Sequence, residues 1–180
     1  MRTKNYLLAL LAALSCGLFS CTAEPHDVKE GRVKVGDQVP SFTVYDDMNI
    51  VFSSSEFVGK RSLLLFFDIT CGQCKDEFPK IEQVWNSLKT APADYCVVAI
   101  SRITAGQTRE QDIETVNNHW SKTDFTMPKY FDENRQVYRL FAEQYVPRVY
   151  LIDKQGVVRW IAVEDVNLSA EELVEKIKSL

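Results

Sequence analysis

The segment Phe66–Pro79 reads FFDITCGQCKDEFP. It begins as an apolar, strand-like run and then places a Cys-x-x-Cys pair where a helix is expected to begin. A helix N-terminus carries unsatisfied backbone N–H groups and the positive end of the helix dipole, so a thiolate at Cys71 should be stabilised. Cys74, one turn further on, is then placed to attack a mixed disulfide formed at Cys71. The segment therefore predicts a strand, a redox-active cysteine pair and a helix.

Two structural alternatives for the cysteine pair are a zinc half-site and a local structural disulfide. A closed zinc site needs four ligands. The other cysteine of the folded region, Cys96, lies in an apolar run, and His26 and His119 are isolated in the sequence. No second ligand pair is visible, so we expect no metal and no other cofactor. Cys96 is expected to be a small hydrophobic residue of the core.

The N-terminus has the pattern of a secretory signal. Basic residues within Met1–Asn5 precede a short apolar stretch, Tyr6–Leu14, which is too short for a comfortable membrane span. The sequence Leu-Phe-Ser-Cys that ends at Cys21 is similar to a bacterial lipobox, in which the cysteine is lipidated and becomes the first mature residue. We therefore expect residues 1–20 to be a lipoprotein signal peptide. A weaker lipobox that ends at Cys16, where Ala13 occupies the place of the preferred leucine, is one alternative, and an ordinary signal peptide with an incidental Cys21 is the other.

Residues 21–32 are polar and aperiodic and are expected to form a tether, and residues 33–180 have the size of one domain with a real core. The formal net charge of the whole chain is −4. Without a basic run, this negative balance argues against nucleic acid as a partner.

The remaining segments alternate between strand and helix patterns. A hairpin over Phe42–Phe52 comes first, and Ser62–Phe67 is apolar throughout, as in a strand covered on both faces. Gly72–Leu88 has apolar residues at helical spacing, interrupted by Pro79. Further along, the pattern predicts a strand over Tyr95–Ser101, helices over Thr108–Trp120 and Glu133–Ala142, a hairpin formed by Arg148–Ile152 and Val157–Val163, and a last helix that is capped by Ser169 and Glu172.

Several motifs in this order resemble the thioredoxin-like superfamily, specifically the TlpA/ResA-type thiol-disulfide oxidoreductases of bacterial cell envelopes. They are Gly36–Phe42, Phe57–Lys60, the cysteine segment described above, and Val146-Pro147 leading into Tyr150–Asp153. The resemblance implies an α/β, thioredoxin-like fold in which helices flank a central mixed β-sheet. It also implies an N-terminal β-hairpin and a helical insert, which we map onto Thr108–Trp120.

The chain departs from the family pattern beside the cysteines. Thr70 stands where a tryptophan is usual, Gln73 where a proline is common, and Phe67 where a second tryptophan is frequent. These differences leave the exchange chemistry intact. They leave the redox potential and the partner open.

The resemblance also implies a cis-proline at Pro147 that faces the cysteine pair. A cis bond there would leave the backbone of Val146 free to pair with an extended substrate segment beside Cys71. Arg148 follows directly, and its charge could favour the Cys71 thiolate or hold an acidic substrate. A solvated surface position is the equal alternative for Arg148.

Glu77 matches the family's active-site glutamate. It lies three residues beyond Cys74, on nearly the same helix face. A partly desolvated carboxyl there could move protons to and from Cys74. The alternative is a solvated helix charge.

Together these features predict a lipid-anchored protein of the bacterial cell envelope that faces the periplasm and exchanges a dithiol for a disulfide. The resemblance implies disulfide-containing envelope proteins as substrates, including apocytochromes c before haem attachment, and a membrane thiol reductant as electron donor. Two alternatives stay open. One is a thiol peroxidase of the related peroxiredoxin group, and the other is a thioredoxin-like binding module without turnover.

Overall fold

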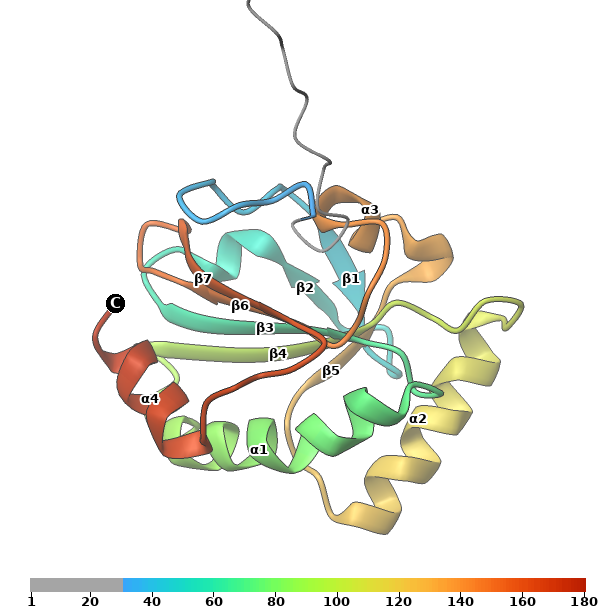
Figure 1. The fold of residues 1–180 in the computed structure, drawn as a ribbon. Coiled ribbons are helices and arrows are strands. Elements are labelled where there is room, and N and C mark those ends of the chain that lie inside the picture. The colour runs from blue at the N-terminus through green and yellow to red at the C-terminus, as the bar shows by residue number, and fades with distance from the viewer. Residues whose placement is uncertain (1–30) are drawn as a thin grey trace, which may run out of the picture.

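The structure is a computed structural model that describes residues 31–180. The predicted signal peptide, the lipidation site Cys21 and most of the predicted tether lie outside the described residues. The strands form one seven-stranded sheet in the order β2-β1-β5-β4-β3-β6-β7 (Figure 1). They are β1 (Thr43–Tyr45), β2 (Val51–Ser53), β3 (Arg61–Phe67), β4 (Tyr95–Ser101), β5 (Lys129–Phe131), β6 (Arg148–Ile152) and β7 (Val158–Val163).

The helices cover both faces of this sheet. They are α1 (Gly72–Leu88), α2 (Arg109–Thr123), α3 (Tyr138–Phe141) and α4 (Ala170–Lys178). Figure 1 shows α1, α2 and α4 on one face, below the sheet, and α3 above it. β3 is parallel to β4 and antiparallel to β6, so the sheet is mixed. The predicted α/β fold with its central mixed sheet is confirmed.

The central strand β3 explains how the cysteine pair is placed. Residues 62–67 are fully buried, as the continuous apolar run predicts for a strand with helices on both faces. The chain leaves the end of β3 and turns directly into α1, which begins at Gly72. The N-terminus of α1 therefore lies at the carboxyl end of the central strands.

An aromatic cluster joins the insert helix α2 to α1 and the sheet. The ring of Phe67 lies 5.1 Å from that of Phe78 in α1 and 5.6 Å from that of Trp120 in α2. Phe125, which follows α2, packs edge-on against Trp120. Such aromatic pairs stabilise beyond the area that they bury. Phe67, at a position where a tryptophan is frequent in the family pattern, thus contacts both helices from the sheet.

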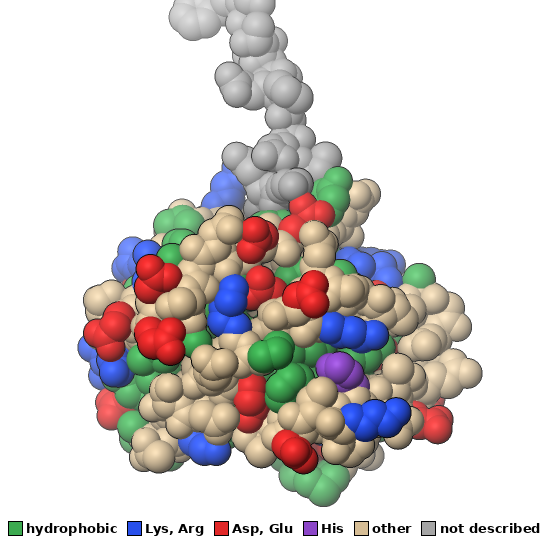
Figure 2. All heavy atoms as spheres, turned by 60° about the horizontal axis from the view of Figure 1, so that its bottom comes forward, with side chains coloured by type: hydrophobic (Ala, Val, Ile, Leu, Met, Phe, Trp, Pro, Cys, Tyr) green, Lys and Arg blue, Asp and Glu red, His purple; other side chains and the backbone are tan. Residues whose placement is uncertain are grey.

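The outer face of the helices is polar. Figure 2 turns this face toward the viewer and shows acidic and basic side chains distributed around a small hydrophobic patch. None of the helices within residues 31–180 is both long enough and apolar enough to span a bilayer.

The predicted helix over Glu133–Ala142 forms only in part, as α3 (Tyr138–Phe141), and the prediction is wrong for the residues before it. Asn134 and Arg135 both have a φ of 57°, in the left-handed region, and only a 3-10 turn forms there. The carboxylate of Asp132 then accepts hydrogen bonds from the backbone N–H groups of Val137 (2.9 Å) and Tyr138 (2.6 Å), which starts the short helix α3 afresh. Strand β5 was not expected from the sequence, because three residues after a proline carry no readable pattern.

Candidate active site

Cys71 is the N-cap residue of α1. Its backbone is extended (φ −76°, ψ 120°), and its N–H donates to the carbonyl of Asp68 at 3.0 Å. The thiol is partly exposed, whereas Cys74, in the first turn of the helix, is fully buried. The pair therefore presents one sulfur to the solvent and keeps the other behind it.

The loop before β6 lies against this thiol. The Sγ atom of Cys71 is 3.5 Å from the carbonyl oxygen of Val146, and the Val146–Pro147 peptide bond is cis. The pairing of β6 with β3 brings these distant segments together, since Arg148 is the register partner of Phe66. The carbonyl of Pro147 in turn accepts a hydrogen bond from the N–H of Glu164 at 2.8 Å.

Burial is the main reason why the pKa of the second thiol, Cys74, is raised. Removal from water, together with the neighbouring Cys71, raises the pKa of Cys74 far above its ordinary value. Cys74 is therefore a neutral thiol at neutral pH. It must lose its proton before it can attack a mixed disulfide.

Glu77 is held by two partners and has only 8% of its surface exposed. One carboxylate oxygen lies 2.8 Å from the ammonium of Lys80, and the other accepts the N–H of Val166 at 3.3 Å. Lys80 also donates to the carbonyl of Val166 at 2.5 Å. The alternative of a solvated helix charge is therefore wrong, because Glu77 joins α1 to the segment that follows β7.

Arg148 lies on the other face of the sheet. Its register partner Phe66 packs against Tyr138, Phe141 and Tyr150, away from α1. The Arg148 side chain is fully buried there. The surface alternative for Arg148 is thus wrong, and so is the predicted contact with an acidic substrate, because a buried guanidinium offers no surface to a partner.

Asp68, which was not expected from the sequence to belong to the site, organises the turn before the cysteines. One of its carboxylate oxygens accepts hydrogen bonds from the backbone N–H (3.0 Å) and hydroxyl (2.7 Å) of Thr70, and from the hydroxyl of Thr104 (2.7 Å). Burial alone would raise its pKa, but these hydrogen bonds and the nearby Arg102 outweigh it, so the pKa of Asp68 is lowered. An Asp-x-Thr sequence directly after a buried strand was the available signal.

Thr70 gains a function from this arrangement. It replaces the usual tryptophan of the family pattern, and its hydroxyl contributes one of the hydrogen bonds that close the turn. The carbonyl of the same Asp68 accepts the N–H of Cys71. The position of the cysteine thus depends on Asp68 through both its side chain and its backbone.

Cys96 lies away from the pair. It is the register partner of Ser62, near the beginning of β3, whereas the cysteine segment follows the end of that strand. Burial raises the pKa of Cys96 to about 12. It packs against the core as a partly buried residue.

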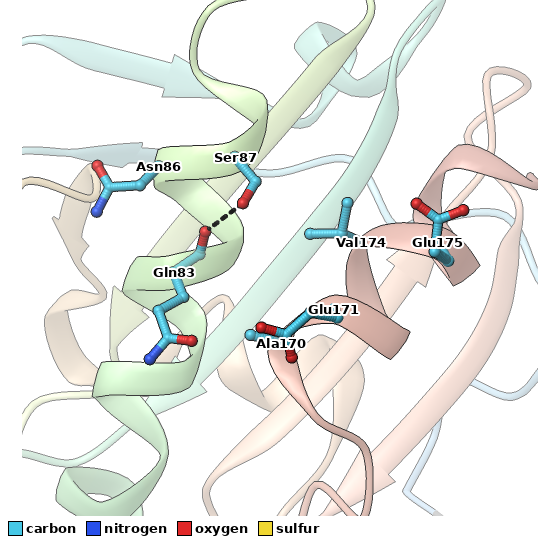
Figure 3. Close-up of a pocket in the computed structure, with 7 residues that line it drawn as sticks. All are labelled: Gln83, Asn86, Ser87, Ala170, Glu171, Val174 and Glu175. Carbon is cyan, nitrogen blue, oxygen red and sulfur yellow. Dashed lines mark hydrogen bonds between the residues drawn. The ribbon is translucent and has the colours of Figure 1, made fainter.

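A hollow of about 400 Å³ between α1 and α4 is also remote from the cysteines (Figure 3). Its lining includes Gln83, Ser87, Glu171 and Val174. Figure 3 shows the Ser87 hydroxyl directed at the carbonyl of Gln83, with which it forms a 2.9 Å hydrogen bond. Residues 83–87 belong to the last turns of α1, so this hollow is not part of the cysteine site.

Comparisons with known proteins agree with this geometry. The family model described as Redoxin matches residues 34–177. A curated relative, the thiol-disulfide oxidoreductase ResA of Bacillus thuringiensis subsp. konkukian, is 26% identical over 97% of this chain and 98% of its own length.

Two solved structures share the fold. A thiol:disulfide interchange protein of the thioredoxin family from Chlorobium tepidum TLS has a TM-score of 0.65 at 21% identity and covers 80% of this chain and 95% of its own. The exposed lipoprotein thioredoxin Etrx1 of Streptococcus pneumoniae has a TM-score of 0.62 at 18% identity, with coverages of 78% and 100%. The chain belongs to the Redoxin family, as a thioredoxin-like thiol-disulfide oxidoreductase of the TlpA/ResA type.

Proposed function

We propose that this protein reduces disulfides of cell-envelope proteins by dithiol-disulfide exchange at Cys71 and Cys74. The observation that carries the proposal is the arrangement of the two sulfurs. Cys71 is partly exposed at the start of α1, 3.5 Å from the Val146 carbonyl, and Cys74 is buried behind it. A partner disulfide can therefore reach the first sulfur and not the second.

The exchange has two steps. The Cys71 thiolate attacks one sulfur of the substrate disulfide, and the other substrate sulfur leaves as a thiolate that takes up a proton. Cys74 then loses its proton and attacks the Cys71 sulfur of the mixed disulfide, which releases the second substrate thiol. Two electrons have passed to the substrate, and a Cys71–Cys74 disulfide remains. A membrane thiol reductant returns the pair to the dithiol.

The surrounding residues assist these steps. The backbone of Val146, next to Pro147, pairs with an extended segment of the substrate. Glu77 accepts the proton of Cys74 and returns it, since its carboxylate is the nearly buried acid that follows the thiol on the same helix. The ion pair with Lys80 keeps this carboxylate in place.

The proposed location is the bacterial cell envelope, with the domain facing the periplasm and anchored by lipid at Cys21. The basic and apolar pattern of residues 1–20 and the Leu-Phe-Ser-Cys sequence support it. The structural neighbour from Streptococcus pneumoniae is an exposed lipoprotein, which is consistent with this location. By family resemblance, apocytochromes c before haem attachment are among the substrates.

The test combines a rate with a potential. The reduced protein should reduce insulin disulfides, and Cys71→Ser should abolish this activity. A glutathione redox titration of the pair should give a potential near the roughly −270 mV of thioredoxin. A value near the roughly −120 mV of the strong envelope oxidants would reverse the direction of electron flow. Peroxide consumption that needs Cys71 alone would indicate the peroxidase, and a complete lack of exchange would indicate the binding module.

A further inference from the structure

We propose that a groove lined by arginines beside the cysteine pair binds an acidic segment of the protein whose disulfide is exchanged. The inference rests on the proposed function and names the substrate class. The arginine groove is a hollow of about 380 Å³ between the loop 103–107 on one side and Asn134, Arg135 and Arg139 on the other.

The groove lies at the same end of the sheet as the cysteines. Its two walls follow the carboxyl ends of β4 and β5, where Ser101 is the register partner of both Phe67 and Phe131. The Cys71 turn starts at the end of β3, the strand next to β4. A substrate that reaches Cys71 therefore passes close to these walls.

Asp68 joins the groove to the cysteine turn. Its carboxylate accepts the hydroxyl of Thr104, on the first wall, at 2.7 Å, and lies 4.0 Å from the guanidinium of Arg135, on the second. Its backbone carbonyl accepts the N–H of Cys71. Only two residues, Ile69 and Thr70, separate this shared anchor from the nucleophile.

The charge of the groove is positive. Arg139 is exposed and has no hydrogen bond or ion pair with the other residues that the structure describes. Arg135 donates from Nε to the carbonyl of Ile103 at 3.3 Å, so its guanidinium is held against the opposite wall of the groove. The groove lining itself holds these two arginines and no carboxylate. The carboxylates around it have other partners: Asp68 is bonded by two threonines, Asp132 accepts the N–H groups of residues 137 and 138, and Glu143 pairs with Arg32, while Glu133 is exposed. In a chain with a formal net charge of −4, two arginines on a lining without an acidic residue favour an anionic partner.

The walls are built from backbone conformations that side chains rarely adopt. Ile103, a β-branched residue, has a φ of 51°, and Asn134 and Arg135 both have a φ of 57°. Such conformations persist only where the surrounding structure enforces them, and they cluster at functional sites. The Arg135–Ile103 hydrogen bond is one of the contacts that enforce these.

The size of the groove favours a peptide segment over a small ion. A hollow of about 380 Å³ is in the range of sites for ligands much larger than one carboxylate or phosphate. A segment that carries one or two acidic side chains next to its cysteine would fill the groove and meet both arginines. The disulfide of the same segment would then lie at Cys71.

The test uses disulfide peptides that differ only in two residues beside the cysteine, which are Glu, Gln or Lys. With the reduced full-length protein, kcat/KM should be highest for the Glu peptide, and the preference for Glu over Gln should fall as salt is added. Arg135→Gln and Arg139→Gln should each reduce this preference about two- to fivefold, as expected for charge pairs at a partly exposed site. The double variant should lose it.

The control is Lys122→Gln, which removes an exposed cation from the last turn of α2 and should keep the preference. Circular dichroism verifies that all variants fold. Equal kcat/KM for the three peptides, or a preference that survives in the double variant, would overturn the proposal.

Binding of the same peptides with serine in place of cysteine is measured in parallel, by fluorescence anisotropy. Lack of turnover of every peptide would refute the proposed function. The order of these affinities would still show whether the arginine groove prefers an acidic segment. Inorganic phosphate that binds the arginines as tightly as the Glu peptide would show a small-anion site instead and refute the inference.

Discussion

The carboxylate of Glu77 accepts a hydrogen bond from the backbone N–H of Val166, 89 residues further along the chain, at 3.3 Å. Lys80 completes the connection through the carbonyl of the same residue. Two residues earlier, the N–H of Glu164 bonds to the carbonyl of Pro147. The helix that carries Cys74 and the loop that faces Cys71 are thus held together through one short segment after β7.

Glu77→Gln should keep the fold but slow thiol exchange. The carboxamide oxygen can still accept the Val166 N–H, whereas the group that titrates is lost, so the pH dependence of the rate should change. The rate of exchange with a small disulfide is measured from acid to alkaline pH for both proteins. Asp76→Asn, an exposed neighbour, is the matched control and should follow the wild type. Superimposable profiles for Glu77→Gln would leave Glu77 with a structural function only.

Cys74→Ser should accumulate long-lived mixed disulfides through Cys71. The exposed nucleophile remains in this variant, while the thiol that resolves the complex is gone. Mass spectrometry of the trapped complexes identifies the linked residue. Cys96→Ser should behave as the wild type does, since Cys96 lies near the other end of the strands. Complexes linked through Cys96 would contradict the assignment of Cys71.

The reduced protein should lose more stability at alkaline pH than the oxidised protein. In the fold, burial raises the pKa of Cys74 above its ordinary value of 9.0, so above that pH this thiol ionises only in the unfolded chain. The native state then binds more protons, and the free energy of unfolding falls as pH rises, by about 1.4 kcal/mol per pH unit for one thiol. In the oxidised protein Cys74 has no proton to lose.

Denaturant unfolding of both redox forms between pH 7 and 10 measures this difference. The pKa of Cys96 is raised to about 12, so Cys96 contributes the same slope to both forms, and Cys96→Ala should remove that common part. Parallel curves for the reduced and oxidised proteins would argue against a buried, neutral Cys74.

Cys21→Ser should move the protein from the membrane fraction to the soluble fraction. Lipid chains contribute about 0.8 kcal/mol per buried methylene, which gives stable anchoring when several chains are attached. Fractionation of cells that express the full chain, followed by immunoblotting, measures the distribution. Cys16→Ser is the control and should stay with the membrane. Unchanged partitioning of Cys21→Ser would refute the lipid anchor and leave the redox assignment in place.

Much of the fold could be predicted because its main elements have strong local patterns. The bounds of α1 (Gly72–Leu88) and β4 (Tyr95–Ser101) agree with the prediction, since one has a clear helical stripe and the other a continuous apolar run. The capping box of Ser169 and Glu172 also forms as predicted. The prediction of one helix over Glu133–Ala142 did not hold, because the buried carboxylate of Asp132 binds the N–H groups of residues 137 and 138 and the helix begins only there. Local periodicity does not reveal such a contact.

The redox-active pair of the candidate site could be predicted, because Cys71 and Cys74 are close together in the sequence and their spacing is typical of this chemistry. The environment of Arg148 was not, because a charged residue at a strand end predicts exposure, and its burial depends on aromatic residues from several elements. The partners of Glu77 depend in the same way on a contact with Val166, far away in the sequence. The residues of a site can thus be found locally, whereas their partners follow from the topology.

The complete burial of Cys74 sets the timing of each encounter. No outside thiol or disulfide can reach this sulfur, so Cys74 reacts only with the Cys71 sulfur beside it, and the release of a partner that Cys74 brings about is intramolecular. The rate of release by this route depends on how often Cys74 loses its proton and approaches Cys71, whereas small thiols in the surroundings can act only on the exposed sulfurs of Cys71 and the partner. The burial of Cys74 thus makes the residence time of a partner depend on the fold of this protein.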